Sequence, residues 1–404
     1  MRAAVLTIVC LLGGIGAAAV QTRAKTLDVY YIDTEGGQST LFVSPTGESL
    51  LVDTGNGGDR DLGRIVETLN AAGVKQIDHL WTTHFHGDHV GALLALAKQM
   101  PVLHFYDHGK PHPNDRIISA AFLASYEELS RGKRTVVVPG DKVRMTGLDV
   151  TAVASANKFL RSNLPGGGQR NTACAGTGAA QKDESSYIDP DNGESAGFVM
   201  TYGRFRTVDL GDLTWNGELD LMCPTNRIGT VDVYLTSHHG LERSGAPALV
   251  HALQPRVAVM NNGTRKGGAP DTFRVLYESP RLEDLWQLHW SYNAGLDNAP
   301  ATFVANIDDN ATIAGVLTAP PPAPRAGGPA GAGPAAPPAA QIPQGAPPPG
   351  AGAPPAGPGR GGPPGGGAAA HTPAYLIKIA AEPDGTFTVT NTRNGFHKTY
   401  RPRN

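Results

Sequence analysis

The sequence has 404 residues, 40% of them hydrophobic, and a formal net charge of −2 at pH 7. This length is enough for one large domain or two ordinary ones. The near-neutral charge excludes the strongly basic surface that tight, non-specific binding to long nucleic acid requires, but a nucleotide or a short phosphodiester stays open as a substrate.

Residues 1–24 are predicted to be a signal peptide. Arg2 supplies a positive start, residues 3–19 are almost all small or apolar, and the alanines at 17–19 offer a cleavage site. An uncleaved run of this length could also anchor the chain in a bilayer, but its Gly and Ala content makes it only weakly hydrophobic. We therefore expect a secreted or periplasmic protein with no stable membrane insertion after cleavage.

Export of the protein would also affect which cysteines remain in the mature chain and whether they pair. Cys10 would leave with the signal, so Cys174 and Cys223 would remain. Two cysteines in an oxidising compartment often pair. The sequence leaves this pairing open, because it does not show whether the two Cα atoms are close enough for a disulfide.

Strands and helices alternate in the first part of the mature chain. The apolar patterns predict strands over 27–32, 39–43, 49–52, 77–83 and 102–106, and helices over 61–72 and 90–100. In the first of these helices, Leu62, Ile65, Val66 and Leu69 lie on one face, and Gly73 ends it. This alternation indicates α/β layers.

A long middle section is interpreted as irregular, and regular elements resume after it. Strands are predicted over 196–201, 205–210, 231–236 and 257–260, with a helix over 246–253. Together these elements make a main domain over residues 25–318.

The C-terminal part divides in two. Residues 319–371 are nearly all Pro, Gly and Ala and are expected to be disordered, because they bury too little apolar surface to offset chain entropy. In residues 372–404, predicted strands at 374–379 and 386–390 form a β-hairpin. We expect this hairpin to pack on the main domain, since an isolated hairpin is marginally stable.

The strongest chemical signal is Thr83-His84-Phe85-His86-Gly87-Asp88-His89, between a predicted strand and a predicted helix. His84 and His86 face the same way in extended chain, and Gly87 permits the turn that brings Asp88 and His89 to the same pocket. Imidazoles and a carboxylate gathered this closely suit Zn, Mn or Fe. All four residues are therefore expected to bind metal, although a polar loop with incidental histidines is the alternative.

Two further signals follow later strands directly. Asp212 follows the strand 205–210, where a carboxylate could bridge two metal ions about 3.5–4 Å apart; alone it would be an ordinary turn residue. Ser237-His238-His239-Gly240 follows the strand 231–236. Because adjacent side chains in extended chain point to opposite sides, one histidine is expected to bind metal and the other to contact substrate or act as an acid. We assign His238 to the metal and His239 to catalysis, with the reverse assignment open.

The remaining histidines are weaker candidates. Those just downstream of the main motif are minor candidates for the site: His104, His108 and His112. Four more are interpreted as surface or core residues: His79, His251, His371 and His397.

Together these motifs resemble the metallo-β-lactamase superfamily, whose metal signature is His-x-His-x-Asp-His. The similarity spans roughly residues 27–306 and includes Asp53-Thr54-Gly55, which resembles an early aspartate turn that is usually structural. It implies that Asp212 is the bridging aspartate and that the His238-His239 pair contains the last metal histidine. The implied fold is an αββα sandwich, with two sheets face to face, helices outside, and the metals at one edge of the sheets.

Within the superfamily, the chain is most similar to the hydrolase domain of bacterial competence DNA-uptake proteins. The similarity rests on Asn192-Gly193-Glu194-Ser195, on Gly211-Asp212 with Glu218, and on residues 237–240. The membrane channel of the competence proteins has no counterpart here, so we do not extend the similarity to DNA uptake.

The pattern departs from the superfamily in one respect. Many members place a third histidine for the first metal shortly before the bridging aspartate, but residues 191–195 contain none. Asn192 or Glu194 is the expected substitute. The implied cofactors are two Zn²⁺ ions, with Mn²⁺ or Fe as alternatives, and the first site, at His84 and His86, is expected to be weaker or partly occupied.

The implied activity is hydrolysis by a metal-activated water, with Asp88, Asp212 and His239 as the catalytic groups. A small or short phosphodiester is the preferred substrate, and Lys158, Arg161, Arg265 and Lys266 are candidates to bind its phosphate. Hydrolysis of lactones, thioesters or β-lactams is a second hypothesis. A non-catalytic metal-binding surface protein is a third, and the oligomeric state stays open.

Overall fold

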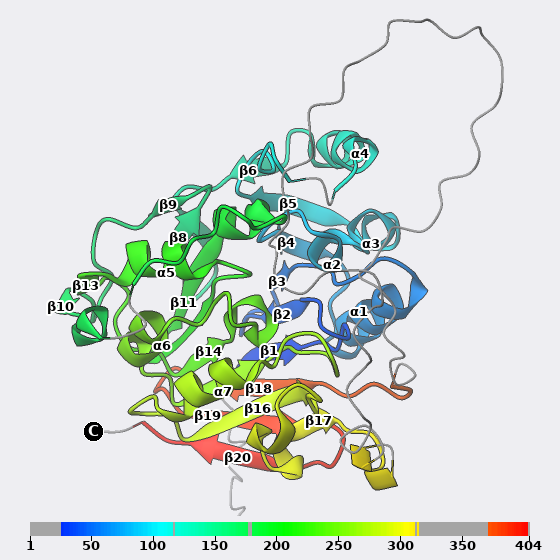
Figure 1. The fold of residues 1–404 in the computed structure, drawn as a ribbon. Helices are drawn as coiled ribbons and strands as arrows, with labels where there is room; N and C mark the ends of the chain where they lie inside the picture. The colour runs from blue at the N-terminus through cyan, green and yellow to red at the C-terminus, as the bar shows by residue number, and fades with distance from the viewer. Residues whose placement is uncertain (1–25, 116–117, 177–179, 312, 315–370, 403–404) are drawn as a thin grey trace, which may run out of the picture.

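The computed structural model describes residues 26–115, 118–176, 180–311, 313–314 and 371–402. Two large β-sheets pack face to face, and helices cover the outer face of each sheet (Figure 1). This arrangement is the αββα sandwich that the sequence resemblance implied. The predicted signal peptide lies outside the described residues, as does the predicted disordered segment except for its last residue, His371.

The first sheet has nine strands in the order β20-β19-β18-β1-β2-β3-β4-β5-β6. It is parallel from β3 to β6 and antiparallel elsewhere. Its strands are β1 (Leu27–Tyr31), β2 (Thr40–Val43), β3 (Ser49–Val52), β4 (Ile77–Trp81), β5 (Val102–Asp107), β6 (Arg134–Val136), β18 (Ile377–Ala381), β19 (Phe387–Asn391) and β20 (His397–Tyr400).

The second sheet has the order β17-β16-β15-β14-β12-β11-β8-β7, and β9 pairs with β8. It is parallel from β12 to β17. Its strands are β7 (Lys142–Met145), β8 (Leu148–Ser155), β9 (Lys158–Phe159), β11 (Gly197–Tyr202), β12 (Phe205–Asp209), β14 (Val233–Leu235), β15 (Val257–Met260), β16 (Asp284–His289) and β17 (Val304–Asn306). A separate short pair joins β10 (Gln169–Arg170) to β13 (Thr225–Asn226).

The main core lies between the two sheets. Trp81 of the first sheet packs edge-on against Phe198 of the second at 5.0 Å between ring centroids, and Phe42 meets the same ring at 5.9 Å. Alternate residues of β1 are buried, so one face of that strand contributes to this core. The packing fixes the two sheets against each other and therefore fixes the loops at their shared edge.

Helices complete the outer layers. The first sheet is covered by α1 (Asp59–Ala71), α2 (Gly87–Val90), α3 (Leu93–Gln99) and α4 (Ala120–Ser130), and the second by α5 (Trp215–Met222), α6 (Pro247–Leu253) and α7 (Pro270–Tyr277). Short 3-10 turns lie at η1 (Thr172–Ala175), η2 (Pro190–Glu194), η3 (Ser237–Gly240), η4 (Gly295–Asp297) and η5 (Ala301–Phe303).

Two predictions of secondary structure were wrong. The helix predicted over 90–100 is two helices, α2 and α3, separated at Gly91 and Ala92. Gly91 packs on the backbone of Gly57, where a Cβ would lie 2.1 Å from the amide nitrogen. The middle section interpreted as irregular contains β7, β8 and α4, because tertiary pairing between β8 and β11 stabilises strands whose own pattern is weak.

The C-terminal strands join the first sheet, as Figure 1 shows for β18 (orange to red) beside β1 (dark blue). The predicted hairpin is the pair β18–β19, and β20 adds a third strand that was not predicted. Tyr400 of β20 accepts a hydrogen bond from Trp286 Nε1 of the second sheet at 3.1 Å. The segment is therefore part of the main core.

Two sequence questions have structural answers. Cys174 and Cys223 form a disulfide, with Cα atoms 5.9 Å apart. In the described part of the chain, no helix combines the length and apolarity needed to cross a bilayer.

Candidate metal centre

The sequence-predicted site residues lie where strands of both sheets end at a common edge. His84 to His89 follow β4, Asp212 follows β12, and His238 with His239 follows β14. Backbone hydrogen bonds connect these loops: the amide of His238 donates to Gly211 O at 3.0 Å, and the amide of Ala196 donates to Thr83 O at 2.7 Å. Residues far apart in the sequence are thus held in one rigid edge.

Four residues offer ligand atoms that all lie within 4.8 Å of one another: Asp88, His89, Asp212 and His239. Asp212 Oδ2 is 3.3 Å from His89 Nε2 and 3.4 Å from His239 Nε2. Two ligands on one tetrahedral ion with bonds of about 2.0 Å are separated by about 3.3 Å. The side chains therefore have the spacing of ligands around a cation.

His84 and His86 complete the sequence motif at the same place. The His84 ring lies 4.1 Å from the His89 ring and 4.4 Å from the His86 ring, measured between centroids. His84 Nε2 is 3.9 Å from Asp212 Oδ2. His86 Nε2 is hydrogen-bonded to Asp115 Oδ2 at 2.8 Å. The other ring nitrogen of His86, Nδ1, is therefore the one available to bind a metal ion.

Buried polar atoms without a hydrogen-bond partner indicate whether a metal cation suits the cluster. Among the described residues, His84 Nε2 and Asp212 Oδ1 are buried without a hydrogen-bond partner. Leaving such groups unsatisfied costs about 1–3 kcal/mol each, more when charged. Metal coordination would satisfy both atoms, so the residues present fit the metal ions that the sequence resemblance implies.

The pKa shifts in the cluster also favour the binding of a metal cation. Burial opposes ionisation of Asp88, but Lys266 and His89 hold its pKa well below the usual range. Burial lowers the pKa of His84, which keeps this imidazole neutral, the form that binds metals. Although burial opposes it, Asp212, Asp88 and Asp53 raise the pKa of His89, because they attract positive charge to its position. A metal cation would be attracted by the same field.

The His238-His239 pair differs from the sequence expectation. The argument that adjacent histidines face opposite sides assumed extended backbone, and it is wrong here, since both residues adopt left-handed conformations with φ of 55° and 56°. Both Nε2 atoms reach Asp212 Oδ2, at 3.5 Å for His238 and 3.4 Å for His239. His239, which we had assigned to catalysis, is the one that also lies near Asp88, at 3.3 Å.

Buried carboxylates that are not candidate ligands orient the histidines. Asp53, expected to be structural, accepts from His89 Nδ1 at 2.7 Å and from Thr83 Oγ1 at 2.6 Å. Asp115, which engages His86, also accepts from the backbone amide of Asp191. Sequence reasoning missed Asp115 and Asp191 as supports. Asp191 adjoins a segment already singled out, but Asp115 sits in a Pro-Asn-Asp turn that carries no signal.

The candidates for the missing third ligand belong to a segment that contacts Asp212. The hydroxyl of Ser195, which follows η2, accepts a hydrogen bond from the amide of Asp212 at 3.3 Å, so this segment adjoins Asp212. Asn192 is buried, and its Oδ1 lacks a hydrogen-bond partner in the part of the chain that the structure describes. Glu194 instead accepts from Asn157 and lies 3.8 Å from His108.

The minor histidine candidates separate into two groups. His108 is buried with Nε2 3.3 Å from Asp191 Oδ2, and the backbone amide of His112 donates to Asp191 Oδ1. Both residues therefore contact Asp191, whose amide donates to Asp115, the partner of His86. His104 stacks on His79 at 5.5 Å between centroids and is exposed.

One of the predicted phosphate-binding cations reaches the centre. Lys266 contacts Asp88 Oδ2 through its ammonium group, while 43% of its side chain stays exposed. The neighbouring Arg265 lies over the Tyr292 ring at 5.2 Å. Lys266 thus places a positive charge at the solvent side of the candidate ligands.

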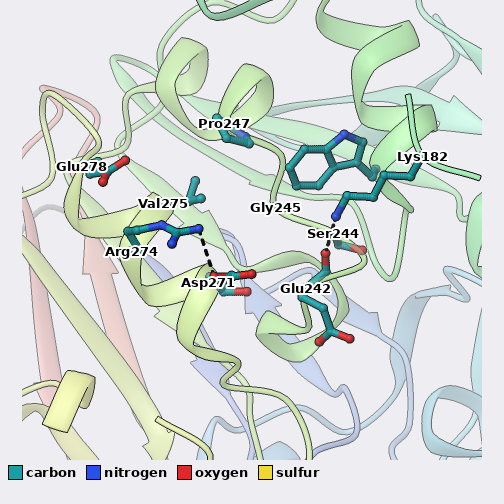
Figure 2. A pocket seen from close by; sticks show the side chains of 11 residues that line it. Lys182, Glu242, Ser244, Gly245, Pro247, Asp271, Arg274, Val275 and Glu278 are labelled. Carbon is teal, nitrogen blue, oxygen red and sulfur yellow. Dashed lines mark hydrogen bonds and ion pairs between the residues drawn. The ribbon is translucent and has the colours of Figure 1, made fainter. Parts of the chain in front are cut away.

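Figure 2 shows a cavity of about 320 Å³ lined by residues of α5, α6, α7 and the loops near them. Ser244 lines it, and Ser244 Oγ is 3.3 Å from His238 Nδ1. Its charged lining comprises three carboxylates and two cations: Glu242, Asp271, Glu278, Lys182 and Arg274. Lys182 lies on the Trp215 ring at 3.7 Å, and Arg274 pairs with Asp271 at 2.9 Å. The cavity therefore offers no surplus of positive charge for an anionic substrate.

Comparisons with known proteins add family information. Residues 33–153 match the sequence model of the metallo-beta-lactamase superfamily. The chain is 26% identical over 230 residues to competence protein ComA of Neisseria gonorrhoeae, covering 57% of this chain and 26% of that protein. The chain thus spans about a quarter of the length of this relative.

Solved structures give distant likenesses. The metallo-beta-lactamase fold protein YhfI of Bacillus subtilis is 12% identical, with a TM-score of 0.41, covering 65% of this chain and 96% of that one. The diiron beta-hydroxylase CmlA of Streptomyces venezuelae is 16% identical, with a TM-score of 0.35, covering 60% of this chain and 46% of that one.

Proposed function

We propose that this chain is a metal-dependent hydrolase that cleaves phosphodiester bonds in small or short substrates. The match of residues 33–153 to the metallo-beta-lactamase superfamily model and the cluster of candidate metal ligands support the hydrolase activity. The observation that carries this substrate class is Lys266, whose ammonium group contacts Asp88 beside the candidate metal ligands and stays partly exposed. A cation at this position suits a substrate whose negative charge sits next to the bond to be cleaved.

The roles of the chain's own residues follow from their contacts. His84, His86, Asp88, His89, Asp212 and one or both of His238 and His239 hold the metal ions, and Asn192 is our candidate for the missing third ligand. When bound, the ions lower the pKa of a water molecule and polarise the bond under attack. Asp53 and Asp115 orient His89 and His86, and Lys266 turns from Asp88 to a phosphate oxygen of the substrate.

Zinc is our proposed metal, because a set rich in imidazole with carboxylates suits it well; Mn²⁺ and Fe suit the same donors. Further support for phosphate chemistry comes from the motifs shared with the hydrolase domain of competence proteins. The net charge of −2 argues for a small or short substrate, since it gives little grip on long nucleic acid. From the composition of residues 1–24 we propose a secreted or periplasmic protein.

The proposal is tested by measuring kcat/KM for a nitrophenyl phosphodiester, a lactone and a β-lactam with zinc-loaded protein. We expect the phosphodiester to be the best substrate. A lactone or β-lactam cleaved at least ~100-fold better, a difference of about 2.7 kcal/mol in the transition state, would refute it.

Substitution of Lys266 tests whether its positive charge favours phosphodiester substrates. Lys266→Ala should lower kcat/KM for the phosphodiester by about tenfold or more, a loss of about 1.4 kcal/mol, and should spare an uncharged ester. Lys266→Arg should restore part of the loss, since it restores the charge. The matched control is Lys75→Ala, at an exposed lysine before the start of β4, whose other end leads to the candidate ligands. Equal losses on charged and uncharged substrates would contradict the role of Lys266.

A further inference from the structure

A second cluster of metal-ligand side chains lies outside the centre described above and shares no residue with it. Glu35 follows β1, His289 ends β16, and His371 is the first described residue after the long Pro/Gly/Ala stretch. Each residue offers one ligand atom, and the three atoms lie within 4.8 Å of one another. Three segments far apart in the sequence therefore meet at one point.

The distances from Glu35 to the two histidines resemble those between metal ligands more than those of hydrogen bonds, whereas His289 Nε2 is also hydrogen-bonded to Asp33 Oδ1 at 2.6 Å. His289 Nε2 is 3.7 Å from Glu35 Oε2, and His371 Nδ1 is 3.8 Å from Glu35 Oε1. A nitrogen–oxygen contact of 3.6 Å or more is not a hydrogen bond. Two ligands on a tetrahedral zinc ion are about 3.3 Å apart, so small side-chain rotations would bring all three onto one ion.

The charges around the cluster leave room for a dication. Three carboxylates surround it, from Asp33, Glu35 and Asp308, and one guanidinium, from Arg64. Glu35, together with Asp308 and Asp33, raises the pKa of His371, because these carboxylates attract positive charge to this largely buried place. Buried charge is costly unless it is paired, and one divalent cation would balance it.

The histidines themselves have unused nitrogens. His289 is fully buried, and its Nδ1 has no hydrogen-bond partner among the described residues; the same holds for both ring nitrogens of His371. The two rings face each other at 4.9 Å between centroids. Asp308 lies 3.1 Å from His371 Nε2, on the far side of the ring from the nitrogen near Glu35. That is the position of a carboxylate that orients a metal-binding histidine.

We propose that Glu35, His289 and His371 bind a structural zinc ion. Asp308 orients His371, and Asp33, now 2.6 Å from His289 Nε2, is the remaining carboxylate within reach of the ion. Since His371 leads into β18, the ion would fix the C-terminal strands, residues 377–400, to β1 of the first sheet and to the end of β16. The site has no part in the proposed hydrolysis, and its test does not use activity.

The test counts zinc by elemental analysis in protein whose main centre is disabled by four substitutions: His84→Ala, His89→Ala, Asp212→Ala and His239→Ala. This background should retain one zinc ion per chain. Adding His371→Ala should remove that ion, and adding His397→Ala should leave it bound. His397 is the matched control, because it is an exposed histidine of the same C-terminal segment. Retention of the ion in the His371 variant, or no zinc in the background, would overturn the proposal.

A second measurement covers the case in which the disabled background does not fold. In the otherwise unchanged chain, His371→Ala and Glu35→Gln should each bind one zinc ion fewer than His397→Ala. Zinc added to metal-stripped protein should raise the melting temperature less in these two variants than in the control, because an ion that binds only the folded state stabilises it. Equal zinc content in all three proteins would overturn the proposal.

Discussion

Asp53 Oδ2 lies 2.7 Å from Nδ1 of His89, across 36 residues of sequence, and both side chains are fully buried. The carboxylate accepts a hydrogen bond from Nδ1–H of His89, so the other ring nitrogen, Nε2, faces Asp212 and Asp88. Asp53 also accepts hydrogen bonds from the backbone amide and the hydroxyl of Thr83, directly before the motif. The aspartate turn that looked structural in the sequence is therefore a support of the metal centre.

Asp53→Asn tests this relationship. An amide presents a donor where the carboxylate accepts, so the His89 ring loses its fixed tautomer and orientation. Loss of such a supporting partner lowers metal affinity by about 10–100-fold. Zinc titration against a competing chelator measures the effect. Unchanged affinity in a folded variant would show that Asp53 acts only in folding.

Asp212→Asn should remove most hydrolytic activity and leave the fold intact. Asp212 Oδ2 lies within 3.9 Å of ring nitrogens from four histidines: His84, His89, His238 and His239. An amide cannot supply the negative charge at this common point. We expect kcat/KM to fall at least ~100-fold, about 2.7 kcal/mol, with metal content reduced and circular dichroism unchanged. Turnover at the wild-type rate would rule out the bridging role.

Gly91→Ala should destabilise the protein by about 1–3 kcal/mol through overpacking. The new Cβ would meet Gly57 N at 2.1 Å and Gly87 O at 2.3 Å, and both are backbone atoms that cannot rotate away. The matched control is Gly63→Ala within α1, where nothing lies within 4 Å of the added atom. This control should be neutral or stabilising by up to about 1 kcal/mol, because alanine favours helix. Urea denaturation of both variants checks the contrast.

Glu218 should make stability fall as pH rises toward neutrality. Burial raises its pKa from 4.5 to about 7, although the amides of Gly245 and Ala246 donate to it. Between these two pH values, the folded state therefore keeps a proton on Glu218 that the unfolded state has lost. The contribution of Glu218 to the free energy of unfolding is fully present below pH 4.5 and is lost as the pH rises through 7. The difference amounts to roughly 3 kcal/mol.

Glu218→Gln should remove this slope, since the amide does not titrate. The measurement is the free energy of unfolding by urea at a series of pH values between 4 and 8, in wild type and variant. Profiles that stay parallel over this range would show that Glu218 is not protonated in the folded protein.

Much of the fold could be predicted from the sequence, because local patterns carried it. The apolar runs of β1, β3 and β15 and the one-sided spacing of α1 lie within a few residues of their predicted bounds. The strand β8 was missed because its stability depends on pairing with β11 and β7 rather than on its own pattern. The break between α2 and α3 was missed because it depends on a close backbone contact with Gly57.

By itself, the sequence determined which residues could bind metal, since His84, His86, Asp88 and His89 are adjacent and their spacing limits where they can point. Only the tertiary structure decided how His238 and His239 approach Asp212, because their left-handed backbone is imposed by the loops around them. The tertiary structure alone also paired Asp53 with His89 and brought His371 to Glu35 and His289. Such long-range contacts follow from the packing of two sheets against each other, which no local pattern of residues encodes.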